Sequence, residues 1–196
     1  MDRTQFLKAL GSRLYPILRS EGFRGSGSTL RRIDIPVIHV FNVQGSTSGD
    51  RCYLNLGAHL TFLPSDGGVD VPTGRYHEYD CAFRSRISPR RASDFGWCYG
   101  TSATDADETI DAICDSWLSE GHAFFDRFAS YPSSFVTLLN GKIRESPHPS
   151  ECLTLARIAI DLALPDMAVS FAQLGLADCP ESAFILRRRL EQLAAS

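Results

Sequence analysis

The segment from Arg51 to Phe62, RCYLNLGAHLTF, limits the possible folds of this chain more than any other segment. Its even-numbered positions are all apolar, and most of its odd-numbered positions carry hydrogen-bonding groups. Because successive side chains of a β-strand point to opposite faces, the pattern predicts a strand with one face in a core. The opposite face would present Tyr53, Asn55, His59 and Thr61.

Three further segments are typical of strands, and they lie close to this one in the sequence. We expect strands over 23–33, 36–44 and 76–87, since these segments combine β-branched or aromatic residues with flanking turn residues. Gly25 and Gly27 weaken the first of them. Neighbouring strands with short connections are most simply antiparallel, which predicts a four-stranded meander.

Helical patterns flank this β region on both sides. Apolar residues recur at helical spacing near the N-terminus, over about 3–20, and again over 104–129. Similar patterns cover 150–164, 165–177 and 181–195. We therefore predict an α+β fold with an N-terminal helix packed on a four-stranded antiparallel sheet, followed by a C-terminal helical region. The predicted domains are 1–130, and 131–196 as a helical extension packed on the first.

The polar face of the predicted sheet is the first candidate binding surface. If the apolar positions face the helices, the other face gathers Tyr53, Asn55, His59, Asp80, Arg84 and Arg86. Arginine side chains suit carboxylate and phosphate groups. The strand register decides whether Asn42 and Gln44, or His39 and Phe41, join this face. It also decides between Arg31 and Arg32.

The charge distribution offers a second candidate surface. Residues 94–130 hold eight acidic side chains against one basic side chain, Arg127. Several of the acidic side chains fall on one predicted helix: Asp105, Asp107, Glu108, Asp111 and Asp115. This helix could form salt bridges within the fold, or it could bind a basic partner.

Catalytic and metal-binding motifs give little support to an enzyme. The sequence contains no Walker loop, GxGxxG, HExxH or GxSxG motif. Two alternatives stay open, a catalytic pair of His59 with Asp80 and a metal site that adds His77. We expect no catalytic residue, no metal ligand and no cofactor.

Composition places the chain among ordinary globular proteins. A net charge of −3 gives no reason to expect direct nucleic-acid binding. The six cysteines form no CxxC pair, so we expect buried free thiols. No segment approaches the roughly 20 apolar residues that span a membrane, and the N-terminus has no signal-peptide core. We expect a cytoplasmic protein.

The order of short motifs resembles a known family. Gly22, Phe23 and Arg24 follow the first helix, and the later motifs are Asn42 and Gln44; Tyr53, Asn55 and Gly57; and Cys81, Arg84 and Arg86. Over about residues 4–120 this pattern is similar to the bacterial domain-of-unknown-function family forty-three-oh-four. The resemblance implies a helix–sheet domain in a bacterial cytosol and no established reaction, and the helices after about 145 are additional.

These observations favour binding over catalysis. We expect a non-enzymatic protein that binds another protein, in its most concrete form an immunity protein that neutralises a cognate bacterial toxin. The alternative is an enzyme or a binder of small anionic ligands that uses the polar sheet face. The sequence does not identify the partner or the oligomeric state.

Overall fold

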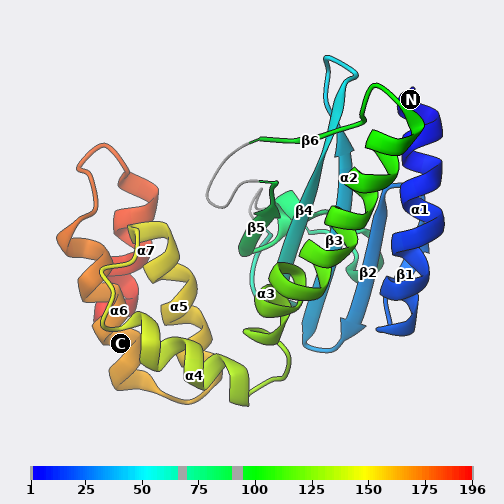
Figure 1. Cartoon of the computed structure of the whole chain (residues 1–196). Coiled ribbons are helices and arrows are strands. Elements are labelled where there is room, and N and C mark those ends of the chain that lie inside the picture. The colour runs from blue at the N-terminus through cyan, green and yellow to red at the C-terminus, as the bar shows by residue number, and fades with distance from the viewer. Residues whose placement is uncertain (1, 66–69, 90–94, 196) are drawn as a thin grey trace. The chain divides into compact units, whose positions relative to one another are not determined.

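The computed structural model describes residues 2–65, 70–89 and 95–195 (Figure 1). The chain forms two compact units, residues 1–126 and 127–196, and each is described by itself. As predicted, the fold is mixed α+β, with an N-terminal helix, an antiparallel sheet and C-terminal helices. The sequence-based boundary at 130/131 and the packing of the extension stay predictions.

The sheet of the first unit has more strands than predicted. β2 (Thr29–Asp34), β3 (Val37–Gly45), β4 (Arg51–Leu60) and β5 (Phe83–Ile87) pair antiparallel in this order. The prediction of a single strand over 23–33 is wrong, because this segment forms a hairpin of two strands, β1 (Arg24–Ser26) and β2. Glycine at 27 adopts a φ of 69° in the hairpin turn, which favours a residue without a side chain. A short strand, β6 (Trp97–Cys98), pairs with the beginning of β4.

Helices cover the apolar face of this sheet (Figure 1). α1 (Arg3–Ser20) buries four apolar side chains at helical spacing: Phe6, Leu10, Leu14 and Leu18. α2 (Ala103–Ser116) continues into a π-helical turn (Trp117–Gly121) and α3 (His122–Asp126). The buried Trp117 ring packs edge-on against the Phe41 ring of β3, with 5.4 Å between the ring centres. The side chains that face the helices are therefore the even-numbered, apolar residues of β4 together with His39 and Phe41 of β3.

The connection from β4 to β5 crosses the other face of the sheet. It contains two single 3₁₀ turns, η1 (Thr73–Arg75) and η2 (Glu78–Asp80). The predicted strand over 76–87 is therefore wrong in its first half, and only Phe83–Ile87 is β-structure. Tyr76 and Cys81 of this connection pack on buried side chains of β3, Ile38 and Val40. Cys81 thus lies on the face opposite to the one its alternation pattern indicated.

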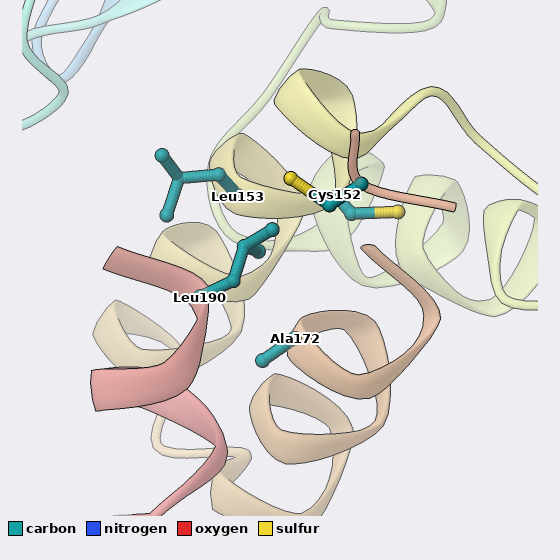
Figure 2. Close-up of a cluster of buried hydrophobic side chains, with 5 residues drawn as sticks. Cys152, Leu153, Ala172 and Leu190 are labelled. Atoms are coloured by element: carbon teal, nitrogen blue, oxygen red, sulfur yellow. The ribbon is translucent and has the colours of Figure 1, made fainter. Parts of the chain in front are cut away.

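The second unit is helical. It comprises α4 (Ser133–Lys142), α5 (Pro149–Asp161), α6 (Pro165–Ala177) and α7 (Phe184–Ala194). A small core joins the last three helices, made of Cys152, Leu153, Ala172, Cys179 and Leu190 (Figure 2). A Cβ atom added at Gly175 would lie 2.8 Å from the Cys152 Cβ atom, so glycine permits the close approach of α5 and α6.

All six cysteines are free thiols, but the prediction that they are buried is wrong for Cys98, which is exposed, and Cys114 is only partly buried. Cys52 and Cys81 are buried in the first unit, and burial raises the pKa of the Cys52 thiol to about 12. Since the thiolate is the reactive form, Cys52 is a packing residue. No helix in the described part of the chain is long and apolar enough to cross a membrane.

Candidate functional site

A row of polar side chains crosses four strands of the sheet at one level. The strand register places Thr29 of β2 opposite Asn42 of β3, Asn42 opposite Asn55 of β4, and Asn55 opposite Arg86 of β5. We call these four residues the transverse row. The register also resolves the alternatives left by the sequence, because Asn42 and Gln44 share a face with Asn55, whereas His39 and Phe41 face the helices.

Side-chain hydrogen bonds connect the members of the transverse row. Arg86 Nε donates to Asn55 Oδ1 at 2.9 Å, and Asn42 Nδ2 donates to Thr29 Oγ1 at 2.9 Å. A longer contact of 3.5 Å from Asn55 Nδ2 to Asn42 Oδ1 links the two halves. The exposed fractions of Asn42 and Asn55 are 8% and 5%. A buried amide needs such partners, because burying an unpaired polar group is costly.

Gly57 allows the η2 turn to lie directly on the sheet next to this row. A Cβ atom at position 57 would lie 2.7 Å from Cys81 Sγ and 3.1 Å from the Glu78 Cα atom. With only a hydrogen at this position, the turn approaches β4 closely enough for Glu78 to reach Asn55. Asn55 Nδ2 lies 3.4 Å from Glu78 Oε1 and 3.1 Å from Gln44 Oε1.

An open pocket of about 880 Å³ lies over the transverse row. Three guanidinium groups line it, from Arg3 of α1 and from Arg84 and Arg86 of β5, together with a single described carboxylate, Glu78. The other polar side chains of its lining are Ser28, Asn42, Gln44, Asn55, His77, Tyr79 and Ser85. The volume is in the range of ligand pockets, and the excess of guanidinium groups favours an anionic ligand.

Four of the six residues predicted for the sheet face belong to this region. Asn55, Arg84 and Arg86 line the pocket, and Tyr53 supports it, because the Arg86 guanidinium lies 4.6 Å from the centre of the Tyr53 ring. Such a cation–π contact restricts the orientation of the arginine.

The other two predicted residues serve the fold. The His59 side chain is fully buried; its Nδ1 accepts a hydrogen bond from the Ala82 N–H (3.1 Å), and its Nε2 lies 3.2 Å from the Leu63 carbonyl oxygen. Burial lowers the pKa of His59. Asp80 belongs to η2 rather than to a strand, and its carboxylate accepts from the His77 backbone N–H at 2.8 Å. The alternative of a catalytic pair of His59 and Asp80 required both side chains on an exposed sheet face, and the structure buries His59 and places Asp80 in η2.

Sequence analysis missed several residues of the pocket. Glu78 was assigned to a continuous strand, although the short motif YHEYDC contains the acidic residues of a 3₁₀ turn. Arg3 comes from the distant N-terminus, and only the fold brings it to the pocket. Within the described ranges, no group of three or more His, Cys, Asp or Glu side chains could hold a metal ion.

Part of the predicted acidic surface on α2 is used within the fold. Asp105 accepts hydrogen bonds from the backbone N–H groups of Thr101 and Ser102, both at 3.1 Å, and completes the capping box of the helix. The hydrogen bond from the Thr101 hydroxyl to this carboxylate (2.6 Å), together with the other bonds from Thr101 and Ser102, lowers the pKa of Asp105. Asp107 and Asp111 form ion pairs with Arg13 of α1. Glu108 and Asp115 are exposed and make no side-chain ion pair within the described residues.

A second polar cluster lies on the helix-covered side of the sheet. Glu21 Oε1 lies 3.2 Å from Trp117 Nε1 and 2.9 Å from His122 Nε2. Arg32 pairs with His39 and therefore lies on this side of the sheet, whereas Arg31 lies on the other. The Arg32 guanidinium carbon is 5.0 Å from the centre of the Phe23 ring, and Arg32 donates to the Glu21 carbonyl oxygen at 3.2 Å. This cluster fixes the π-helical turn against the end of α1.

The fold and the pocket define a class of protein: an α+β domain with an amide-lined pocket on the sheet face that the helices leave uncovered. A family model described as "Domain of unknown function (DUF4304)" matches residues 14–126, which is more than half of the chain. The chain therefore belongs to this family, as its motifs suggested, and the match ends where the first compact unit ends. No curated protein and no solved structure matches the chain.

Proposed function

We propose that this protein binds a ligand with an anionic group in the pocket over the transverse row. The observation that carries the proposal is the row itself. Its four polar side chains come from four strands, are aligned in register and are joined by hydrogen bonds. Thr29, Asn42 and Asn55 are buried, and Asn42, Asn55 and Arg86 line the open pocket. A solvated sheet face needs no such arrangement, whereas preorganised polar groups in a pocket are typical of ligand sites.

The charges around the pocket support an anionic ligand. Within the described part of the lining, Arg3, Arg84 and Arg86 contribute three positive charges, and Glu78 contributes one negative charge. The Arg86 guanidinium is held by Asn55 on one side and by the Tyr53 ring on the other. An arginine that is already oriented loses less side-chain entropy when it binds a carboxylate or phosphate.

The geometry supports binding more than catalysis. The sheet-face histidine that would serve as an acid or base, His59, is buried and contacts the backbone of its own connection. We therefore propose a non-enzymatic protein, and a bacterial cytoplasmic setting in keeping with the family resemblance.

A thermal-shift screen against phosphate, citrate, nucleotides and phosphorylated sugars tests this proposal. A ligand that binds the folded state raises the melting temperature by mass action. The shift should be reduced in Arg84→Ala and unchanged in Arg144→Ala, which removes the same charge from an exposed position in the second unit. Equal shifts in the two variants would show that the anions bind elsewhere.

A second candidate function is that of an immunity protein that neutralises a toxin through α2. The observation that favours it is the exposure of Asp107, Glu108, Asp111 and Asp115 on the outer side of one helix. Acidic surfaces of this kind steer and hold basic partners. The partner would then be a protein whose own active site is positively charged.

Charge reversal at the two carboxylates without internal partners tests this second function. The double variant Glu108→Lys/Asp115→Lys should abolish inhibition of the cognate toxin, whereas Glu181→Lys/Glu191→Lys should preserve it. The control reverses two exposed charges of the second unit. Full inhibition by the α2 variant would exclude this surface as the contact.

A further inference from the structure

Around the Asn55 amide, the hydrogen-bond acceptors outnumber the hydrogens that this amide can donate. Because Arg86 Nε donates to Asn55 Oδ1, the orientation of the Asn55 amide is fixed and its Nδ2 group points toward the acceptors. Three acceptors lie around this one NH₂ group: Gln44 Oε1 at 3.1 Å, Glu78 Oε1 at 3.4 Å and Asn42 Oδ1 at 3.5 Å. An amide NH₂ has two hydrogens, so at least one acceptor lacks a donor from Asn55.

Glu78 adds a further acceptor. Its second carboxylate oxygen, Oε2, is buried and has no hydrogen-bond donor among the residues that the structure describes. Carboxylate oxygens that are removed from water are stabilised by donors, and most strongly by positively charged donors. The Glu78 wall of the pocket therefore fits a group that donates several hydrogen bonds and carries a positive charge.

The β5 side of the pocket has the opposite character. Arg84 and Arg86 are exposed and lie on the same face of β5, two residues apart. Arg84 pairs with Gly57 of β4, and Arg86 pairs with Asn55 of β4. Both are donors without acceptor capacity. The pocket thus places a donor-rich, positively charged side next to an acceptor-rich side with a carboxylate.

We propose that the ligand is zwitterionic, with a primary ammonium group that binds at Glu78 and Gln44 and an anionic group that binds at Arg84 and Arg86. An ammonium group has three N–H donors, which matches the surplus of acceptors at the floor. Amino acids and amino-alkyl phosphates both have this chemistry. The inference rests on the proposed function, because it specifies the ligand of the same pocket.

Two matched pairs of probes test the inference by isothermal titration calorimetry on the full chain. The first pair is 2-aminoethyl phosphate and ethyl phosphate, and the second is L-glutamate and glutarate. Within each pair the probes differ mainly in the amino group. We expect the amino-bearing member of at least one pair to bind about tenfold more tightly, and the pair that does so distinguishes a phosphate source from a carboxylate source.

Variants locate the ammonium group. Glu78→Gln should remove the advantage of the amino-bearing probe, whereas Glu108→Gln on α2 should leave it unchanged. Gln44→Leu changes an exposed side chain, so it provides a second variant if Glu78→Gln does not fold, and it should reduce the advantage. Arg84→Ala should weaken both members of a pair alike.

The outcomes separate this inference from the proposed function. Equal affinity for the two members of each pair overturns the zwitterion and leaves an anion site. An amino-group advantage that survives in both Glu78→Gln and Gln44→Leu also overturns it. If no probe of either pair binds, the inference is overturned, and the proposed function is decided separately by the thermal-shift screen.

Discussion

The acidic helix α2 and the transverse row of the sheet are both polar surfaces, but their side chains are engaged in different ways. On α2 the carboxylates act one at a time: Asp105 caps the helix, and Asp107 and Asp111 share Arg13. In the row each side chain depends on its neighbours, and Asn55 contacts Asn42 and Arg86 from its two ends. The comparison teaches that the number of polar residues on a surface says less about a site than how they are connected and how deeply they are buried.

Burial explains why the two surfaces should respond differently to mutation. Asp107 and Asp111 have exposed side-chain fractions of 65% and 60%, so water can replace their partners. Asn55 has an exposed fraction of 5%, so water does not readily replace what it loses. Surface ion pairs contribute little to stability, whereas an orphaned buried polar group is costly.

The largest effect is expected from Gly57→Ala. The added methyl group would meet Cys81 Sγ at 2.7 Å and the Glu78 Cα atom at 3.1 Å, so the η2 turn must move away from the sheet. We expect a loss of about 3 kcal/mol in the free energy of unfolding, measured by urea denaturation, together with loss of ligand binding. Gly141→Ala is the control, because nothing lies within 4 Å of an added Cβ atom in α4. If both variants were equally stable, the turn would not rest on Gly57.

A somewhat smaller loss is expected from Asn55→Ala. The change removes the hydrogen bond from Arg86 Nε to Asn55 Oδ1 and the contact of the buried Asn42 Oδ1 with Asn55 Nδ2. We expect the free energy of unfolding to fall by about 2 kcal/mol, with a coupling to Arg86→Ala of more than about 0.5 kcal/mol in a double-mutant cycle. Asn140→Ala on the surface of α4 should be close to neutral. Strict additivity with Arg86→Ala would show that the row is a set of independent contacts.

His59→Gln should change the pH dependence of stability. Burial lowers the pKa of the His59 imidazole in the folded state. In the unfolded chain the same imidazole has a pKa of about 6.5, so below that pH the unfolded state binds more protons than the folded state. The stability of the wild type should therefore fall as the pH decreases below about 6.5, and the variant should show a shallower fall. Denaturation midpoints between about pH 7 and pH 5 measure the difference. Parallel curves would mean that His59 is not held neutral by the fold.

Asp105→Ala tests the part of α2 that serves the fold. Hydrogen bonds from Thr101 and Ser102 lower the pKa of Asp105 in the folded state. Its contribution is present above the unfolded pKa of about 3.9 and is lost as the pH falls through the lower folded value. The wild type should therefore lose more stability than the variant on acidification below about pH 4, as followed by circular dichroism. An unchanged acid response would contradict the capping role.

The smallest effect is expected from Asp107→Asn/Asp111→Asn. Both carboxylates pair with Arg13 at an exposed position, so the free energy of unfolding should change by less than about 1 kcal/mol. A change comparable to that of Asn55→Ala would overturn the contrast between the two surfaces. Repeating the measurement at high salt should reduce the small effect further.

Sequence analysis located the part of the site that depends on local pattern. The alternation in 51–62 placed Asn55 on the face opposite Leu54 and Leu56, and the structure has this arrangement. The choice between Arg31 and Arg32 depends on how β2 pairs with β3, which no single segment encodes. The register places Arg31 opposite Val40, where its Nε donates to the Tyr76 carbonyl oxygen at 2.5 Å.

The η2 turn, which carries Glu78 of the pocket lining, was not predictable from a local pattern. The segment before β5 contains Tyr79, Cys81 and Phe83 at alternate positions, so it predicted one long strand. The η2 turn forms instead because Asp80 completes a capping box with His77 and because Gly57, some 20 residues earlier, leaves room for it. Contacts between segments that are distant in the sequence decided the outcome, and periodicity does not report them.

The transverse row also gives the sheet a means of discriminating between strand alignments. A shift of β4 by one residue relative to β3 would turn Asn55 toward the aromatic core around Phe41 and Trp117, and it would bring Leu54 or Leu56 into line with Asn42. Such a misaligned sheet would lose the contacts of Asn55 with Asn42 and Arg86 and would bury an unpaired amide. A ligand that requires the complete row would then bind only the correctly aligned sheet, so its affinity would report on the fidelity of folding.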